Sequence, residues 1–562
     1  MRSSVQRSLV LATLMALLLG VVGATPSVVA KQTTATRVAG IDIDAATIPE
    51  LQAAMDANRL KSVQLVQFYL HRIRTLDPKL HSVITVSKTA LADARAADKA
   101  RRGGDDRPLL GIPVIVKDNV NTTGMPTAAG SWALAGSSPS DAFIIEQMKA
   151  AGAIIIAKAN LSEWANFRSG PSSSGWSGIG GQTNLAYVLD RNPCGSSSGT
   201  GVAVSADLAT VGVGTETDGS IVCPAGANGL AGIKPTIGLW SRAGIIPISA
   251  DQDTAGPMAR NVTDAAVLLG AGIGVDPDDA ATAEQVGHAF TDYTQFLDAD
   301  ALDGARIGVW HSYDPAVADA ATVAIFEDTV ATLEDLGATV IDPLEIDFGT
   351  GFDNEFPALL CEFKTDIASY LETYTAAGYP KTLQDLIDFD LAHPELEGPW
   401  NEFVFDLAQA TNGRDADCAA ARAATTPVVQ AAIDDAMAAN DLDAIVAPTN
   451  NPAWVTDPVN GDSFEGFVSS SSAAAVSGYA GITVANGFVG PLPIGVSFIA
   501  GRWSEPTIIG LAYAFEQATL VRTPPQFLAS TTAAKAKASG KAHGKEHSLV
   551  PGRGKAPDAA LH

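Results

Sequence analysis

Short apolar runs separated by Gly, Pro and Ser characterise the middle of the chain and predict buried strands. The clearest are Leu110 to Val116 and Ala151 to Ala157. Residues 142–150 lie between them and predict a crossover helix, so the three segments form a βαβ unit within a parallel or mixed sheet. Arg306 to Trp310 and Ala444 to Ala447 predict further strands. The fold class expected from this pattern is α/β.

Helical patterns flank this strand-rich region. Thr47 and Glu50 predict a helix start, because Thr and Glu side chains at this spacing can bond to each other's backbone amides. A second helix, from about Thr89 to Arg102, should end at Gly103. Residues 505–519 predict the last helix.

By composition the chain divides into four segments. Residues 45–530 carry these patterns without an internal repeat or a boundary, so we expect a single domain there. Residues 1–30 have the pattern of an export signal, and residues 31–44 form a short lead. Residues 531–562 are rich in Ala, Gly and Lys and show no apolar periodicity, which predicts a disordered basic tail.

The N-terminus has the organisation of a secretory signal. Arg2 and Arg7 precede an apolar run from Leu9 to Gly23, and small residues allow cleavage after Ala24 or Ala30. The run is roughly 15 residues long, whereas a helix that spans a bilayer needs about 20. We therefore expect a cleaved signal, a secreted or periplasmic location and no stable membrane insertion after cleavage. An uncleaved anchor is the alternative.

Charge and hydropathy restrict the possible functions. The 562 residues are 46% hydrophobic and 17% charged, which is typical of a globular protein with a large core. Lys and Arg number 36 against 62 Asp and Glu, for a formal net charge of -26. Because this charge repels nucleic acid, we expect no nucleic-acid partner.

Four cysteines, Cys194, Cys223, Cys361 and Cys418, occur at spacings that fit no zinc pattern, and we expect neither a metal nor another cofactor. In an oxidising compartment they could form one or two disulfides or stay free. The sequence leaves the pairing and the oligomeric state open.

Two turns rich in Gly and Ser carry the candidate chemistry. They are Cys194 to Gly199 and Gly214 to Ser220, and Lys117 ends the apolar strand upstream. Glycine lets backbone amides face a common point, so the amides of Thr217, Asp218, Gly219 and Ser220 could converge on a developing oxyanion. Judged from these two segments alone, an equally good interpretation is that they are tight turns whose backbone conformation requires glycine.

These turns and several flanking segments resemble the amidase signature family over residues 45–525. The matching segments are Gly111 to Asp118, Gly214 to Ala225, Gly232 to Gly238, Ser241 to Pro247, Asp253 to Pro257, Leu492 to Val496 and Leu511 to Gln517. The resemblance implies a large mixed β-sheet with helices on both faces and one catalytic domain. Within the family the chain most resembles the peptide amidases, whose pattern Cys194 to Gly199 and Thr215 to Pro224 match. Many other members have Gly where Asp218 stands here.

The family's catalytic triad falls on Ser220 as nucleophile, Ser196 as proton relay and Lys117 as base. Thr217, Asp218 and Gly219 would then supply the oxyanion hole and contact the substrate. A buried lysine can lose its proton because desolvation disfavours the ammonium, so this assignment is physically sound. The implied function is hydrolysis of carboxamide C–N bonds through an acyl-enzyme, with C-terminal amides of peptides as the expected substrates.

Other interpretations remain. Gly195 to Gly199 also fits the G-x-S-x-G elbow with Ser197 as nucleophile, but that reading needs a histidine and none lies between His81 and His288. His288, His311 and His393 have no supporting motif. The enzyme could instead act on small aliphatic or aryl amides or on esters, or transfer ammonia within an assembly. A non-catalytic binding protein of the same fold is the remaining alternative.

Several residues near the motifs have expected structural roles. We expect Asp118 and Arg242 to order the site. Glu216 and Asp218 could favour a positively charged or amide-bearing group of the substrate, or accept bonds from neighbouring turn amides, which is the interpretation we prefer. The loop from Ser169 to Gly178, which contains Trp176, either lines the cleft or lies on the surface.

Overall fold

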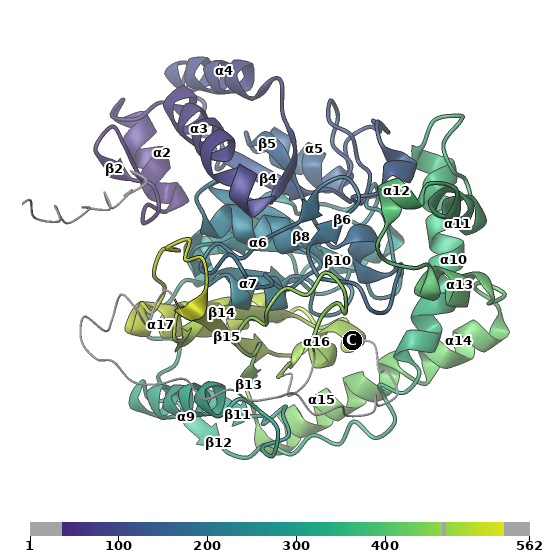
Figure 1. Ribbon diagram of the computed structural model, residues 1–562. Helices are drawn as coiled ribbons and strands as arrows, with labels where there is room; N and C mark the ends of the chain where they lie inside the picture. The colour runs from purple at the N-terminus through teal and green to yellow at the C-terminus, as the bar shows by residue number, and fades with distance from the viewer. Residues whose placement is uncertain (1–35, 464–467, 533–562) are drawn as a thin grey trace, which may run out of the picture. The chain divides into compact units, whose positions relative to one another are not determined.

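An eleven-stranded mixed β-sheet runs through the protein (Figure 1). The computed structural model describes residues 36–463 and 468–532. The expected signal at 1–30, the start of the lead at 31–44 and nearly all of the expected tail at 531–562 therefore lie outside the described residues. In sheet order the strands are β12 (Thr339–Ile341), β11 (Arg306–Val309), β13 (Ala444–Pro448), β15 (Leu492–Ile499), β14 (Gly481–Val489), β9 (Ala231–Lys234), β10 (Thr254–Ala259), β8 (Val211–Glu216), β4 (Pro113–Lys117), β5 (Ile154–Ala159) and β3 (Val83–Val86).

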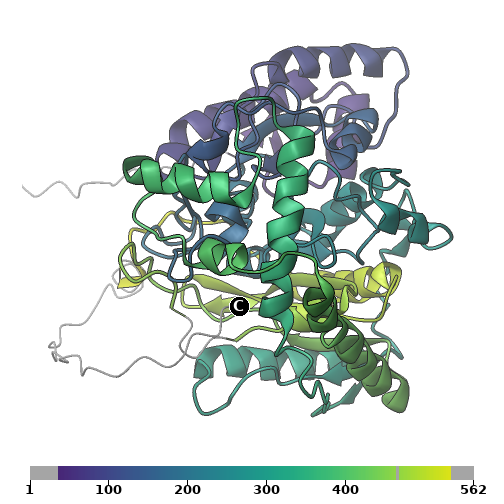
Figure 2. The same cartoon turned by 90° about the vertical axis from the view of Figure 1, so that its right-hand side faces the viewer.

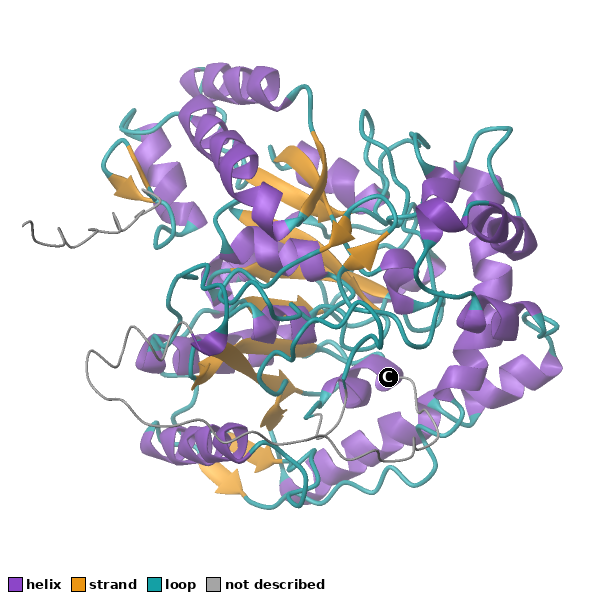
Figure 3. Ribbon diagram, in the orientation of Figure 1, coloured by secondary structure: helices purple, strands orange, loops and turns teal. Residues whose placement is uncertain are grey.

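Parallel and antiparallel pairs both occur in this sheet. β4 runs parallel to β5 and β8, whereas β10 is antiparallel to β8 and β9. Helices cover both faces of the sheet, so β4, β5 and β8 are buried along their whole length (Figure 3). Burial on both faces explains why these strands are nearly continuous apolar runs in the sequence. The expected α/β class and mixed sheet are confirmed, while the boundaries at 45 and 530 stay predictions.

Most of the helices lie between these strands in the sequence. The helices are α2 (Ile48–Asp56), α3 (Ser62–Leu80), α4 (Ala90–Arg102), α5 (Phe143–Ala150), α6 (Ser198–Ser205), α7 (Val222–Ala227), α8 (Val262–Ala271), α9 (Ala320–Asp335), α10 (Glu355–Tyr374), α11 (Leu383–Ala392), α12 (Pro394–Glu397), α13 (Phe403–Gln409), α14 (Ala416–Ala423), α15 (Thr426–Asn440), α16 (Ser471–Ser477) and α17 (Glu505–Thr519). Of these, α10 to α15 follow one another without an intervening strand. Two short pairs, β1 (Arg37–Val38) with β2 (Ile41–Asp42) and β6 (Trp176–Ser177) with β7 (Gly181–Gln182), lie outside the large sheet.

Most predicted elements are present, with shifts at their ends. The Thr47 capping box starts α2, Gly103 caps α4, and α17 has the predicted bounds. The predicted strand at 110–116 begins three residues later, because Gly111 has a φ of 77° and belongs to a turn. The strand predicted from residue 151 begins at Ile154, since Gly152, with a φ of 96°, turns the chain after α5.

A helical segment from α10 to α14 packs beside the sheet and has its own apolar cluster. Its green helices lie at the front of Figure 2. The cluster includes Phe363, Leu386 and Phe405 together with Leu161 and Trp164 from the loop after β5. A disulfide between Cys361 and Cys418 joins α10 to α14. This segment was not predicted from the sequence, and it supplies one wall of the candidate site.

Within the described residues, no helix is both long and apolar enough to cross a membrane.

Candidate active site

Lys117, the last residue of β4, points into the protein and is completely buried. Its Nζ lies 2.8 Å from Ser196 Oγ, 2.8 Å from Thr215 Oγ1 and 3.2 Å from the Thr215 carbonyl oxygen. Asn119 Nδ2 also donates to Thr215 Oγ1, at 3.0 Å. Because β4 and β8 are parallel neighbours, their carboxyl ends bring Lys117 and Thr215 together at one edge of the sheet.

Burial controls the protonation of Lys117. Desolvation lowers its pKa from 10.5 to about 7, although the negative charges of Asp253 and Glu216 partly oppose this shift. The ammonium form therefore loses most of its usual preference. At neutral pH a substantial fraction of Lys117 is an uncharged amine that can accept a proton.

Ser196 lies in the first Gly and Ser turn, after a cis peptide bond between Gly195 and Ser196. The residue is completely buried, and its carbonyl accepts a hydrogen bond from the Ser162 amide at 3.0 Å. The turn then continues into α6. The structure thus places Ser196 Oγ directly against the Lys117 amine.

Ser220 lies in the second turn, between β8 and α7. Gly219 has a φ of 72°, which lets the chain turn sharply just before Ser220. Glu216 holds the turn, since its Oε2 accepts from the amides of Ile221 and Val222 at 2.7 and 3.0 Å. Ser220 is 8% exposed and lines a cavity.

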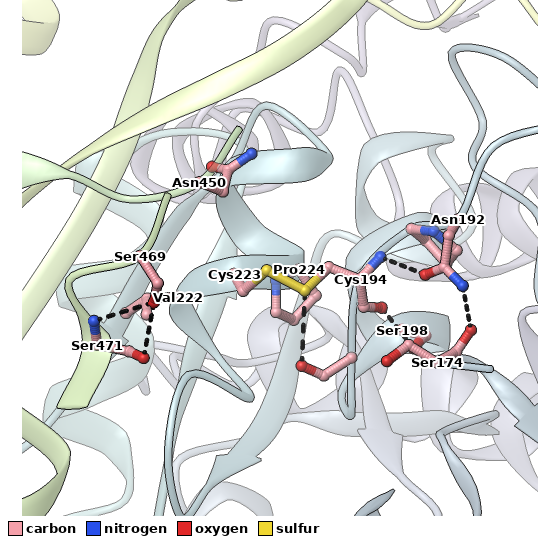
Figure 4. Close-up of a disulfide and its surroundings, with 12 residues drawn as sticks. Ser174, Asn192, Cys194, Ser198, Val222, Cys223, Pro224, Asn450, Ser469 and Ser471 are labelled. Carbon is pink, nitrogen blue, oxygen red and sulfur yellow. Dashed lines mark hydrogen bonds between the residues drawn. A yellow bond between two sulfur atoms is a disulfide. The ribbon is translucent and has the colours of Figure 1, made fainter. Parts of the chain in front are cut away.

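Two links join the turns that carry Ser196 and Ser220. The Ser197 amide donates to the Ser220 carbonyl at 3.2 Å. A disulfide joins Cys194 to Cys223, and Figure 4 shows it between Ser174 and Asn192 on one side and Ser469 and Ser471 on the other. Both serines are therefore held in one rigid unit, although their hydroxyls form no hydrogen bond with each other in the described structure.

The cavity at Ser220 has a volume of about 130 Å³. Thr217, Asp218 and Gly219 line it beside Ser220. The amides of Asp218, Gly219 and Ser220 donate to no other group in the described part of the chain, which leaves them available to a ligand. Apolar side chains form much of the remaining wall: Phe167, Ile248, Phe356, Leu359, Val404 and Trp454.

A second cavity, of about 470 Å³, adjoins the first and shares Ala165, Thr217 and Ile248 with it. Asn119 and Thr215 line this cavity, so it lies next to the partners of Lys117. Asp253 lines it as well, and burial raises the pKa of this carboxyl to about 6.

The alternative nucleophile Ser197 has a structural role. Its side chain is completely buried, and its Oγ donates to the Thr215 carbonyl at 3.0 Å and accepts from the Thr215 amide at 3.1 Å. The histidines considered for an elbow lie elsewhere: His288 stacks on Trp503, and His311 binds Asp342. Among the described residues that line the cavity there is no histidine.

Of the expected supporting contacts, most are present. Asp118 Oδ2 accepts from the amides of Ala128 and Gly130, and Arg242 forms an ion pair with Asp279 at 2.6 Å. Asp218 differs from expectation, because its carboxylate accepts from the hydroxyls of Ser471 and Ser472 rather than from turn amides. These serines begin α16, and no sequence motif indicates that this helix lies beside the second turn.

The loop from Ser169 to Gly178 contributes to the cavity through Ser174, whereas Trp176 packs against Trp400. Sequence reasoning missed Glu355 and Phe356, which line the cavity from the start of α10. No motif marks them, because they are distant in sequence from both turns. Nor do the described residues contain a group of three or more His, Cys, Asp and Glu suited to a metal ion.

Comparisons with known proteins identify the family of the chain. The family described as Amidase matches residues 64–509. A probable amidase from Arabidopsis thaliana is 39% identical over 503 residues, which cover 87% of this chain and 92% of that protein. A glutamyl-tRNA(Gln) amidotransferase subunit from Pseudomonas aeruginosa is 33% identical over 501 residues, 86% of this chain and 99% of that protein.

Among solved structures, the native peptide amidase from Stenotrophomonas maltophilia superimposes with a TM-score of 0.81 at 45% sequence identity. The match covers 86% of this chain and 99% of that one.

Proposed function

The chain belongs to the amidase family and is an amide-hydrolysing enzyme, and from this premise we propose that it is an exported serine amidase acting on C-terminal amides of peptides. One observation carries the proposal. Lys117 Nζ and Ser196 Oγ are 2.8 Å apart in a fully buried site, and Ser220 faces the cavity from the adjoining turn.

In the proposed reaction, uncharged Lys117 accepts the proton of Ser196, and Ser196 takes the proton of Ser220. Ser220 Oγ attacks the amide carbonyl, and the oxyanion that forms receives hydrogen bonds from the amides of Asp218 and Gly219. The protons return through Ser196 to the leaving nitrogen. Ammonia departs and leaves an ester between the acyl group and Ser220, which water then hydrolyses by the same route.

Two considerations support peptide amides as substrates. The similarity to a peptide amidase extends along 86% of this chain. In addition, the apolar wall formed by Phe167, Phe356 and Leu359 can bury a side chain next to the reacting carbonyl. The alternative is hydrolysis of small aliphatic or aryl amides or of esters. Such substrates would react by the same chemistry but would fill less of the cavity.

Export is supported by the N-terminal signal pattern and by the disulfides at Cys194–Cys223 and Cys361–Cys418, because disulfides persist in oxidising compartments. Export also disfavours the role of an ammonia-transferring subunit in a cytosolic assembly. We propose a secreted or periplasmic location.

The test measures ammonia release from amidated peptides and from small amides, together with labelling by a fluorophosphonate. We expect wild-type protein to release ammonia and to be labelled, and Ser220→Ala to do neither. Ser197→Ala is the matched control, since Ser197 is the neighbouring alternative nucleophile. Equal labelling of wild type and Ser220→Ala would refute the nucleophile. Absence of ammonia from every peptide amide, with turnover of small amides, would refute the substrate class.

A further inference from the structure

The cavity at Ser220 contains two acidic side chains, Asp218 and Glu355, and among its described lining residues no Lys, Arg or His. Asp218 lies two residues before Ser220, and Glu355 lines the cavity from the start of α10. Neither the motifs nor the proposed reaction uses the carboxyl of Glu355.

Glu355 is only 6% exposed, and one of its two carboxyl oxygens has no hydrogen-bond donor among the described residues. Its Oε1 accepts from Gln252 Nε2 at 2.6 Å, while Oε2 accepts from no group in the described part of the chain. Because Glu355 lines the cavity, a carboxyl oxygen without a donor there can accept a hydrogen bond from a ligand. It is available to a donor on the substrate.

The surrounding charges favour a cationic donor. The carboxylate of Asp218 accepts hydrogen bonds from the hydroxyls of Ser471 and Ser472. The cations nearest to the two acids are already engaged: Arg422 pairs with Glu362 at 2.6 Å, and Lys234 is shared among Glu216, Glu505 and Asp218. When Glu355 is ionised, the site therefore carries surplus negative potential.

The rest of the wall is apolar, formed by Phe167, Ile248, Phe356, Leu359 and Val404. Lysine and arginine side chains combine an apolar stem with a cationic head, so they can use both parts of such a cavity. This deepens the proposed function and rests on it. We propose that Asp218 and Glu355 form a cation subsite that selects peptide amides with a C-terminal arginine or lysine.

The subsite should depend on pH. Desolvation, reinforced by the charge of Asp218, raises the pKa of Glu355 to about 8, while Gln252 and Arg422 oppose the shift. Glu355 is thus mostly protonated at pH 6 and mostly ionised at pH 9. A guanidinium stays charged over this range. The preference of the enzyme for an amide with a cationic side chain should therefore rise with pH between 6 and 9.

The experiment compares the amides of N-acetylarginine and N-acetylcitrulline, whose side chains have equal length but differ in charge. The measured quantity is the ratio of their kcat/KM values at pH 6 and pH 9, in which the pH dependence of the shared triad cancels. We expect wild type to prefer the arginine amide by about tenfold at pH 9 and less at pH 6. In Glu355→Gln the ratio should fall towards one and lose its pH dependence.

Glu372→Gln is the matched control, since it removes the same charge from an exposed position on the same helix. It should keep the wild-type ratio. A Glu355→Gln ratio equal to that of wild type at both pH values would overturn the subsite, and so would a wild-type enzyme without preference for arginine. Failure of both substrates and all other amides to release ammonia would instead overturn the proposed function, and the subsite with it.

Binding can be measured without turnover in Ser220→Ala by titration calorimetry with N-acetylarginine amide at pH 8. Binding should release protons, because the guanidinium favours ionised Glu355, and the further change Glu355→Gln should abolish the release. Equal proton release in both proteins would contradict the subsite.

Discussion

Burial shifts the protonation equilibrium of Lys117 towards the uncharged amine. An exposed lysine is almost fully charged at neutral pH, whereas complete burial lowers the pKa of Lys117 to about 7. The negative charges of Asp253 and Glu216 keep the pKa from falling further. A substantial fraction of the group is therefore uncharged near neutral pH while remaining basic enough to accept a proton.

From this we predict that kcat/KM for an uncharged amide falls about tenfold per pH unit below about pH 7, because protonated Lys117 cannot act as a base. The sign follows from the direction of titration: the active form is the deprotonated one, so activity rises with pH. Lys117→Ala should lose at least about a thousandfold in kcat while retaining wild-type circular dichroism. A Lys117→Ala enzyme with nearly wild-type rates across this range would refute the assignment.

At the scale of single residues, the sequence predicted the groups that lie within motifs. Lys117, Ser196 and Ser220 stand in segments that resemble those of the family. That resemblance made them the candidates, since the turns alone are equally consistent with tight turns that require glycine. Glu355 could not be found in this way, since it reaches the cavity only through the packing of α10. The hydrogen-bond partners predicted for Asp218 were also wrong. Its carboxylate accepts from Ser471 and Ser472, which are more than 250 residues away in the sequence.

At the scale of elements, two disulfides of similar design allow a direct comparison. Cys194–Cys223 closes 29 residues and joins the two active-site turns, while Cys361–Cys418 closes 57 residues and joins α10 to α14. In the chain-entropy description each stabilises the protein by about 3–4 kcal/mol. They should differ in their effect on activity.

We predict that the double variant Cys194→Ser with Cys223→Ser loses most of its kcat, because the turns that align Ser196 and Ser220 are no longer tied together. The control, Cys361→Ser with Cys418→Ser, should lose a similar free energy of unfolding but keep more activity at temperatures where it is folded. Urea unfolding and ammonia release measure the two quantities. Equal losses of kcat in the two variants would contradict a positioning role for Cys194–Cys223.

Elements with local signals were predictable, and those defined by distant contacts were not. The Thr47 and Glu50 pair fixes the start of α2, and alternation of strand and helix fixes β4, α5 and β5. The segment from α10 to α14 was missed because its helices are stabilised by packing on the loop after β5, as in the contact of Trp164 with Phe405. Neighbour positions in the sheet, such as β10 between β8 and β9, depend on crossovers that local patterns do not specify.

At the scale of the whole molecule, the buried side chain of Arg168, in the loop after β5, contacts carboxyls of the segment from α10 to α14. Arg168 Nε lies 2.8 Å from Glu402 and 3.5 Å from Asp390, and its Nη1 pairs with Glu163 and lies 3.6 Å from Glu397. A single cation thus faces four buried carboxyls. Burial raises the pKa of Glu163 well above its usual value and that of Asp390 to about 9, so Asp390 is largely protonated at neutral pH.

This cluster makes stability depend on pH. Between about pH 4 and pH 9 the folded protein binds more protons at Asp390 than the unfolded chain does. Stability must then fall as pH rises through that window. We predict that wild type loses on the order of 1–3 kcal/mol of unfolding free energy between pH 6 and pH 9 through Asp390, and that Asp390→Asn loses less.

Asp388→Asn, an exposed change on the same helix, should follow wild type in urea unfolding at both pH values. Equal pH slopes in Asp390→Asn and wild type would refute the role of the cluster.

The same contacts connect stability with activity, because Ala165 to Phe167 and Val404, on either side of the cluster, line the cavity at Ser220. Activity should therefore rise with pH as Lys117 loses its proton. At alkaline pH activity should decline as this wall loosens, and in Asp390→Asn the decline should begin at a higher pH.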